Sequence, residues 1–304
     1  VMGHRLPDAD SFGAAIGIYR AAKTLNKKAY IVIDNPTSSI IPLMNTFRDN
    51  QDYEADMFVN NHEAKEIMDD NTLLVVVDTN KPSITQCEDL LYMAKMIVVL
   101  DHHRQGSDTI RNSVLSYIEP YASSASEMVA EILQYFTEGI RIRNVEADSI
   151  YAGIMIDTDN FMQKTGVRTF EAAAFLRRCG ADVTRVRKLF REDMNDYKAR
   201  GETIRNAELF RGQFAISECP SDYVDSPTVV GVQAANELLN IVGVKASFVL
   251  TEYKGVIYIS ARAIDEVSVQ IIMERMGGGG HLNMAGCQLE TVNMEGARSL
   301  LKST

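Results

Sequence analysis

The chain has 304 residues, of which 46% are hydrophobic and 24% are charged, a composition typical of an ordinary globular protein. This length predicts two domains, each long enough to bury a sizeable core. The formal net charge of −10 argues against broad electrostatic binding to a nucleic-acid backbone, although it leaves a local basic cleft open, and bound cations would offset part of the negative charge.

The first part of the chain alternates between helical and strand-like patterns. Continuous apolar runs with many β-branched residues predict strands, and apolar residues at helical spacing predict helices. The predicted strands cover residues 29–33, 73–77 and 96–100, and the predicted helices cover residues 11–25, 61–68 and 123–133. Because strands that alternate with helices form βαβ units, we expect a parallel sheet with helices on both faces.

The second part of the chain has shorter elements. Residues 145–176 read mainly as helix with a break near 157–166, and a charged helix over 186–209 is expected to link two domains. Beyond it, short strands and helices are predicted for residues 213–216, 229–239, 246–250, 256–260 and 267–275. We therefore predict an α/β protein with a parallel-sheet domain over residues 1–200, linker helix included, and a smaller α/β domain over residues 201–304.

Asp101-His102-His103 directly follow the predicted strand 96–100. Open α/β sheets bind ligands at the carboxyl ends of their strands, which is where these side chains are expected to lie. Two histidines and an aspartate are costly to bury without a partner, and a bound cation is the simplest partner. The alternative is an exposed polar turn.

Three further segments carry carboxylates or imidazoles beside apolar stretches: residues 3–11, Asp78 after the strand 73–77, and Asp157. Each has a simpler explanation as a helix cap or a turn. If the segments converge, they supply enough ligands for two metal ions, namely His4, Asp8, Asp10, Asp78, His102 and Asp157. Mixed carboxylate and imidazole ligands suit Mn²⁺, Fe²⁺, Co²⁺ or Zn²⁺ better than Ca²⁺.

Asp78 is the predicted bridge between the two ions because it ends a central strand. Such a pair of ions suits in-line displacement at phosphorus. We therefore predict catalytic roles for Asp78 and for His103, which would contact the scissile phosphate or assist the leaving oxygen.

A glycine-rich stretch, residues 277–286, marks the second domain. Glycines allow close backbone approach to an anion, and an arginine suits a phosphate. Alternatively, the glycines form a flexible turn and Arg262 is a solvated surface charge. The predicted substrate-binding residues are Arg262, Gly278, Gly279, Gly280, His281 and Asn283.

The pattern His4-x-x-x-Asp8-x-Asp10, then Asp78, Asp101-His102-His103 and Asp157, resembles the four motifs of the DHH phosphoesterases, and the glycine-rich stretch resembles the signature of the DHH-associated C-terminal domain. The resemblance covers nearly the whole chain. It implies two Mn²⁺ ions in a cleft between the domains, and Asp101 would orient a histidine. One ion would be held by His4, Asp8 and Asp78, and the other by Asp10, Asp78, His102 and Asp157.

Within this family, residues 277–283 are most similar to GdpP-type cyclic-di-AMP phosphodiesterases. This resemblance implies hydrolysis of cyclic di-AMP to pApA by in-line attack of a metal-bound hydroxide. It also implies that the chain is the cytoplasmic part of a membrane-anchored bacterial protein, which agrees with its abrupt start at Val1. No membrane contact by this part and no long nucleic-acid partner are expected, and a homodimer remains open.

Two alternatives remain open. A RecJ-like exonuclease or an NrnA-type oligoribonuclease would act on short oligonucleotides with the same ligands. A catalytically silent nucleotide-binding regulatory module would bind nucleotide in the presence of Mn²⁺ and release no product.

Overall fold

The computed structural model describes residues 1–191, 193–264 and 267–304, and the chain divides into two compact units, Val1–Arg191 and Glu192–Thr304. The predicted helix over 186–209 is two helices, α8 (Val183–Leu189) and α9 (Met194–Arg205), and residue 192 between them lies outside the described residues. Among the described residues, no helix combines the length and apolar character needed to cross a bilayer.

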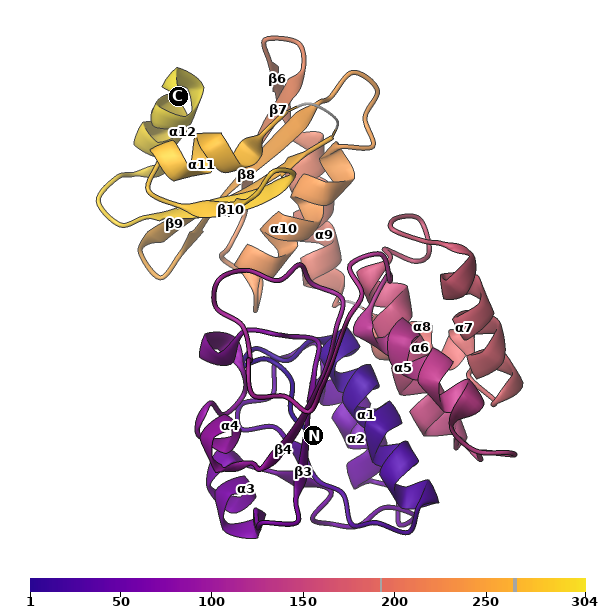
Figure 1. Cartoon of the computed structure of the whole chain (residues 1–304). Coiled ribbons are helices and arrows are strands. Elements are labelled where there is room, and N and C mark those ends of the chain that lie inside the picture. The colour runs from indigo at the N-terminus through magenta and orange to yellow at the C-terminus, as the bar shows by residue number, and fades with distance from the viewer. Residues whose placement is uncertain (192, 265–266) are drawn as a thin grey trace. The chain divides into compact units, whose positions relative to one another are not determined.

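The first unit is built on parallel strands, as the alternating pattern predicts (Figure 1). Strand β3 pairs with β4, β4 pairs with β5, and β1 pairs with β2, all in parallel. Met2 joins the two groups because it bridges Val32 of β1 and Val76 of β3. The strands are β1 (Ile31–Val32), β2 (Phe58–Val59), β3 (Leu73–Val77), β4 (Met96–Asp101) and β5 (Leu115–Ile118).

Both faces of this sheet are buried because alternate residues of each strand point to opposite sides. In β3, Leu74 and Val76 belong to a core shared with α3 (Asn61–Ile67) and α4 (Asp89–Met93). Val75 and Val77 belong to a larger core on the other face. The helices of that face are α1 (Ala9–Thr24), α2 (Ile41–Arg48), α5 (Ala125–Phe136), α6 (Asn144–Asp157), α7 (Val167–Arg178) and α8.

Glycines let α1 lie unusually close to α5 and α6. A Cβ on Gly13 would lie 2.6 Å from the Ser149 carbonyl oxygen and 2.7 Å from Ser126 Oγ. A Cβ on Gly153 of α6 would lie 2.2 Å from the same Ser126 oxygen. This close approach brings the start of α5 against Asp10 at the start of α1.

The second unit is a six-stranded sheet in the order β10-β11-β9-β8-β7-β6, in which only β7 and β8 pair in parallel. One face packs on α9 and α10 (Pro227–Leu238), and the other on α11 (Val269–Arg275) and α12 (Met294–Ser303). The strands are β6 (Glu208–Phe210), β7 (Phe214–Cys219), β8 (Ala246–Tyr253), β9 (Val256–Ala263), β10 (Gly279–His281) and β11 (Met284–Leu289).

The glycine-rich stretch is only partly a loop. Gly277 follows α11 with φ of 82°, a conformation that favours glycine. Gly279–His281 differ, because they form the edge strand β10 and pair with β11. The expectation of a flexible turn is therefore wrong for these residues, which the ladder to β11 holds in an extended conformation.

Candidate metal centre

Asp78 lies directly after β3, and its backbone adopts a left-handed conformation with φ of 58°. Aspartate tolerates this conformation better than most residues, although it is uncommon outside glycine. The amide of Asp78 donates to the carbonyl of Leu100 in β4 at 2.9 Å, which fixes the turn to the neighbouring strand. The carboxylate is almost fully buried at the carboxyl end of the sheet.

His4, Asp8 and Asp78 form the first cluster. His4 Nε2 lies 3.2 Å from Asp78 Oδ2 and 3.5 Å from Asp8 Oδ2. Asp8 also caps α1, because its Oδ1 accepts the amide of Ser11 at 2.9 Å. The cap uses Oδ1 of Asp8 and leaves Oδ2 facing His4, so capping of α1 does not exclude Asp8 as a ligand.

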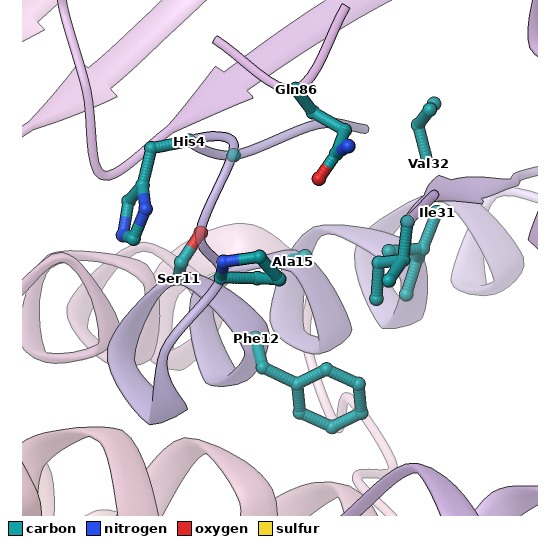
Figure 2. Close-up of a pocket in the computed structure, with 10 residues that line it drawn as sticks. His4, Ser11, Phe12, Ala15, Ile31, Val32 and Gln86 are labelled. Carbon is teal, nitrogen blue, oxygen red and sulfur yellow. The ribbon is translucent and has the colours of Figure 1, made fainter. Parts of the chain in front are cut away.

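The loop that carries His4 is anchored beside a cavity of only about 10 Å³. Gly3 accepts the Gln86 amide at 2.8 Å, and His4 bridges Thr85. Figure 2 shows the Gln86 side chain directed toward α1 on one side of this loop and the His4 imidazole on the other. A Cβ on Gly3 would lie 1.8 Å from Ser11 Oγ, so the loop packs tightly against α1.

His102 is the centre of the second cluster. Its Nε2 lies 3.4 Å from Asp78 Oδ1, 3.6 Å from Asp10 Oδ2 and 3.6 Å from Asp157 Oδ2. Asp10 is held from behind by α5, whose first amides, those of Ala125 and Ser126, each donate to its carboxylate at 2.7 Å. A helix N-terminus favours a carboxylate at this position.

Asp78 belongs to both clusters, with one oxygen toward His4 and the other toward His102. Its Oδ1 is buried and accepts no hydrogen bond from any described residue. A buried carboxylate oxygen without a donor is costly, and a cation is a partner that would remove this cost. The donor set and the unpaired oxygen therefore fit two cations that share Asp78.

The electrostatics of the cluster lead to the same conclusion. Burial disfavours the charged imidazole of His4, yet its contacts with the Asp78 and Asp8 carboxylates outweigh burial and raise the pKa to about 10. Burial likewise disfavours the charged imidazole of His102, and the nearby carboxylates of Asp78, Asp10 and Asp157 outweigh it and raise the pKa to about 9. Burial also opposes ionisation of Asp78, but the neighbouring imidazoles of His102 and His4 lower its pKa to about 2. Burial and repulsion from Asp78 raise the pKa of Asp157 to about 6 and that of Asp10 well above its usual value. Positive charge is thus strongly favoured here.

Asp101 contacts His103 rather than His102, which answers a question that the sequence leaves open. Its Oδ1 accepts from His103 Nδ1 at 2.8 Å and from the His103 amide at 3.1 Å. Asn80 completes the group because its side-chain amide donates to Asp101 Oδ2 and, at 3.2 Å, to the His103 carbonyl. His103 itself is half exposed. The role of Asn80 was not predicted, although Asp78-Thr79-Asn80 marks its position in the sequence.

In the second unit, Arg262 of β9 is held rather than free. Its Nε donates to Asn236 Oδ1 of α10 at 2.8 Å, and Nη1 donates to the Ala261 carbonyl at 2.9 Å. Arg262 pairs with Met284 across β9 and β11, and Met284 pairs with His281 across β11 and β10. The side chain of His281 lies outside what the structure describes.

The glycines predicted to bind substrate fall into two kinds. A Cβ on Gly278 would lie 2.1 Å from the Gly286 carbonyl, and one on Gly280 would lie 2.5 Å from Ala285 Cα, so both positions are closed by the sheet. A Cβ on Gly279 would meet nothing within 4 Å. Asn283, in the turn between the strands, accepts the Ala263 amide through its carbonyl at 2.9 Å.

Comparison with known families gives matches at both ends of the chain. Residues 1–154 match the DHH family, N-terminal domain, and residues 222–304 match the DHHA1 domain. The chain is 42% identical over 308 residues to the cyclic-di-AMP phosphodiesterase GdpP of Bacillus subtilis, covering 99% of this chain and 46% of that protein. It is 39% identical over 306 residues to the cyclic-di-AMP phosphodiesterase PdeA of Listeria monocytogenes, covering 100% and 46%.

The chain therefore spans about half the length of the curated relatives it matches. Among solved structures, it is similar to an exopolyphosphatase-related protein from Bacteroides fragilis. The TM-score is 0.79 and the identity is 20%, and the match covers 99% of this chain and 90% of that one. At this identity the likeness shows the fold.

Proposed function

The chain belongs to the DHH family, and from this premise we propose that it is a phosphodiesterase that hydrolyses cyclic di-AMP to pApA with two divalent metal ions. The observation that carries the proposal is the position of Asp78, whose two carboxylate oxygens face separate clusters of acids and imidazoles. We propose cyclic di-AMP as the substrate because the two relatives named above are cyclic-di-AMP phosphodiesterases.

The proposed ligands divide between two ions. His4, Asp8 and Asp78 would hold one, and Asp10, His102 and Asp157 would hold the other, together with the second oxygen of Asp78. We propose Mn²⁺ because this mixed set of oxygen and nitrogen donors suits it. When bound, the ions would supply an activated water near neutral pH and would offset negative charge at the phosphorus.

His103 is the proposed acid for the leaving oxygen. Because Asp101 holds its Nδ1, the imidazole is oriented and its Nε2 remains for another partner. Cleavage to pApA breaks the bond between phosphorus and a ribose 3′ oxygen, and Nε2 would donate a proton to that oxygen as it leaves. Exposure of His103 is consistent with contact to substrate.

Arg262 and the glycine-rich stretch are the proposed substrate-binding group of the second unit. Gly279 lies in an edge strand with open space beside it, so a phosphate has room to approach its backbone. Arg262 would add a planar charge, already oriented by Asn236. The other proposed members of this substrate-binding group are Gly278, Gly280, His281 and Asn283.

The assay incubates the purified chain and Mn²⁺ with cyclic di-AMP, cyclic di-GMP, pApA and a short RNA, and resolves the products by chromatography. We expect cyclic di-AMP to be converted to pApA faster than any other substrate is cleaved. Faster cleavage of the short RNA would favour an oligoribonuclease or exonuclease. Nucleotide binding without any product would favour a silent regulatory module.

We also infer that the chain is the cytoplasmic part of a longer, membrane-anchored protein. The chain covers less than half of each of the two phosphodiesterases named above, which supports this inference. Fractionation of the full-length protein with membranes, and release of this part by proteolysis, would test it. Light scattering of the purified chain would test for a homodimer.

A further inference from the structure

The backbone directly after Asp157 is unusual. Three consecutive residues that are not glycine, Asp159, Asn160 and Phe161, have φ of 47°, 57° and 65°. Left-handed conformations of such residues normally occur singly, because the Cβ crowds the backbone. A run of three persists only where the surrounding structure holds it, and such runs gather at functional sites.

Thr158 anchors this left-handed turn at its start. The side chain is fully buried, and Oγ1 donates to the Ile154 carbonyl at 2.6 Å and accepts the Phe161 amide at 3.0 Å. The Thr158 carbonyl accepts the amides of Met162 at 3.0 Å and Gln163 at 2.9 Å. One residue thus fastens the turn both to the last turn of α6 and to the chain that follows.

Phe161 anchors the turn at its other end. Its ring lies 5.5 Å from the ring of Tyr151 in α6 and 6.0 Å from that of Phe170 in α7, measured between centroids. The Phe161 side chain packs against the large core of the first unit. The turn is therefore fixed at both ends to the helices that flank it.

Asp157 needs such support more than the other proposed ligands do. It is the last residue of α6, where helices fray and where the dipole disfavours a carboxylate. Asp10, by contrast, accepts two amides of α5. Within the described part of the chain, the Asp157 carboxylate accepts no hydrogen bond, and its Oδ2 lies 3.6 Å from His102 Nε2. Its position therefore depends on the backbone.

We propose that Thr158 is a positioning residue that, through the left-handed turn, sets Asp157 toward the metal centre beside His102. This inference rests on the proposed function only through the assignment of Asp157 as a metal ligand. It predicts that the hydroxyl of Thr158 affects the ion held by Asp10, Asp78, His102 and Asp157 and leaves the other ion unaffected.

The test measures Mn²⁺ binding to the chelator-treated chain by calorimetry. Thr158→Val keeps the shape of the side chain and removes the hydroxyl. We expect one of two binding events to weaken by about tenfold, the lower end of the effect of residues that orient ligands. Thr158→Ser should restore wild-type affinity.

Thr203→Val is the matched control. Thr203 is also fully buried, and its Oγ1 makes the same bond to the carbonyl four residues earlier, that of Ala199, at 2.8 Å. It lies in α9 of the second unit. We expect it to leave both Mn²⁺ affinities unchanged, so that any loss specific to Thr158→Val does not reflect the missing helix bond alone.

A double-mutant cycle with Asp157→Asn isolates the mechanism. If Thr158 acts through Asp157, Thr158→Val should cause no further loss of Mn²⁺ affinity in the Asp157→Asn background. An equal loss in both backgrounds, or a lower unfolding temperature with unchanged affinity, would overturn the inference. Failure to hydrolyse cyclic di-AMP while two ions bind would count against the proposed function alone.

Discussion

Asp78 occupies the point at which the two ligand clusters meet, and its backbone contributes to this position. At the carboxyl end of β3, the left-handed backbone of Asp78 turns the chain, and the hydrogen bond from its amide to the Leu100 carbonyl fixes that turn. With its oxygens facing His4 and His102, a single carboxylate couples the two clusters. Substitution of Asp78 should therefore affect both at once.

Asp78→Asn keeps the size of the side chain and removes its charge. We expect the rate of cyclic di-AMP hydrolysis to fall by about 10³-fold, because the site loses electrostatic stabilisation at its centre. Asp108→Asn is the control, since Asp108 is an exposed carboxylate that bonds Ser83 outside both clusters. A rate for Asp78→Asn within a few-fold of the Asp108→Asn rate would remove Asp78 from the mechanism.

His103→Ala separates the proposed acid from the proposed ligands. We expect kcat to fall by about 10²–10⁴-fold, the usual contribution of a positioned acid. Mn²⁺ affinity should stay close to that of the wild type, because His103 belongs to neither assigned ligand set. Calorimetry beside steady-state kinetics checks both values, and a parallel loss of Mn²⁺ affinity would instead make His103 a ligand.

At the scale of elements, the ligands are placed by the ends of strands and helices rather than by long loops. Asp78 and His102 follow neighbouring parallel strands, and Asp10 lies at the start of α1 against the start of α5. Gly13 of α1 and Gly153 of α6 both pack against Ser126 of α5, and this close packing sets the distances among the three helices. The packing of the first unit's core therefore determines the geometry of the site.

The edge strand β10 allows one glycine to be tested apart from its neighbours. By register, Gly279 lies on the same sheet face as Arg262, since Gly279 pairs with Gly286 two residues along β11 from Met284. We expect Gly279→Ala to raise KM by about tenfold, equivalent to about 1.4 kcal/mol, without a change in stability.

Gly278→Ala is the contrasting variant. Its Cβ would lie 2.1 Å from the Gly286 carbonyl and 2.4 Å from Cys287 Cβ, so we expect the free energy of unfolding to fall by about 1–3 kcal/mol. Urea unfolding and KM measured for both variants check the distinction. If Gly279→Ala leaves KM unchanged, the glycines have no part in binding substrate.

At the scale of the whole molecule, the sequence predicts elements well where hydrophobic burial is continuous. The apolar runs of β3 and β4 predict a covered parallel sheet because few other structures bury such runs. Strand β5 was missed because it is only half buried at its edge and carries no such run. The break between α8 and α9 was missed because both helices are rich in charge, which obscures their ends.

For the site, the sequence predicts which residues carry metal chemistry but not how they meet. Asp78 and His102 meet because the parallel topology brings the carboxyl ends of β3 and β4 together, and helix packing brings Asp10 and Asp157 beside them, which is a property of tertiary structure. The support of Asp10 by the α5 amides comes from backbone groups, which no residue type announces. The residue types also do not indicate that Asp101 contacts His103 rather than His102.

The two units should respond differently to metal. Because the proposed ligands all belong to Val1–Arg191, Mn²⁺ should slow amide hydrogen exchange in that unit, chiefly in the first turns of α1 and α5 and after β3 and β4. At 100 times the dissociation constant, binding should add about 2.7 kcal/mol to the free energy of unfolding. Asp78→Asn should lose most of this gain. Protection confined to residues 222–304, with none near Asp78, would contradict the assignment of the metal centre to the first unit.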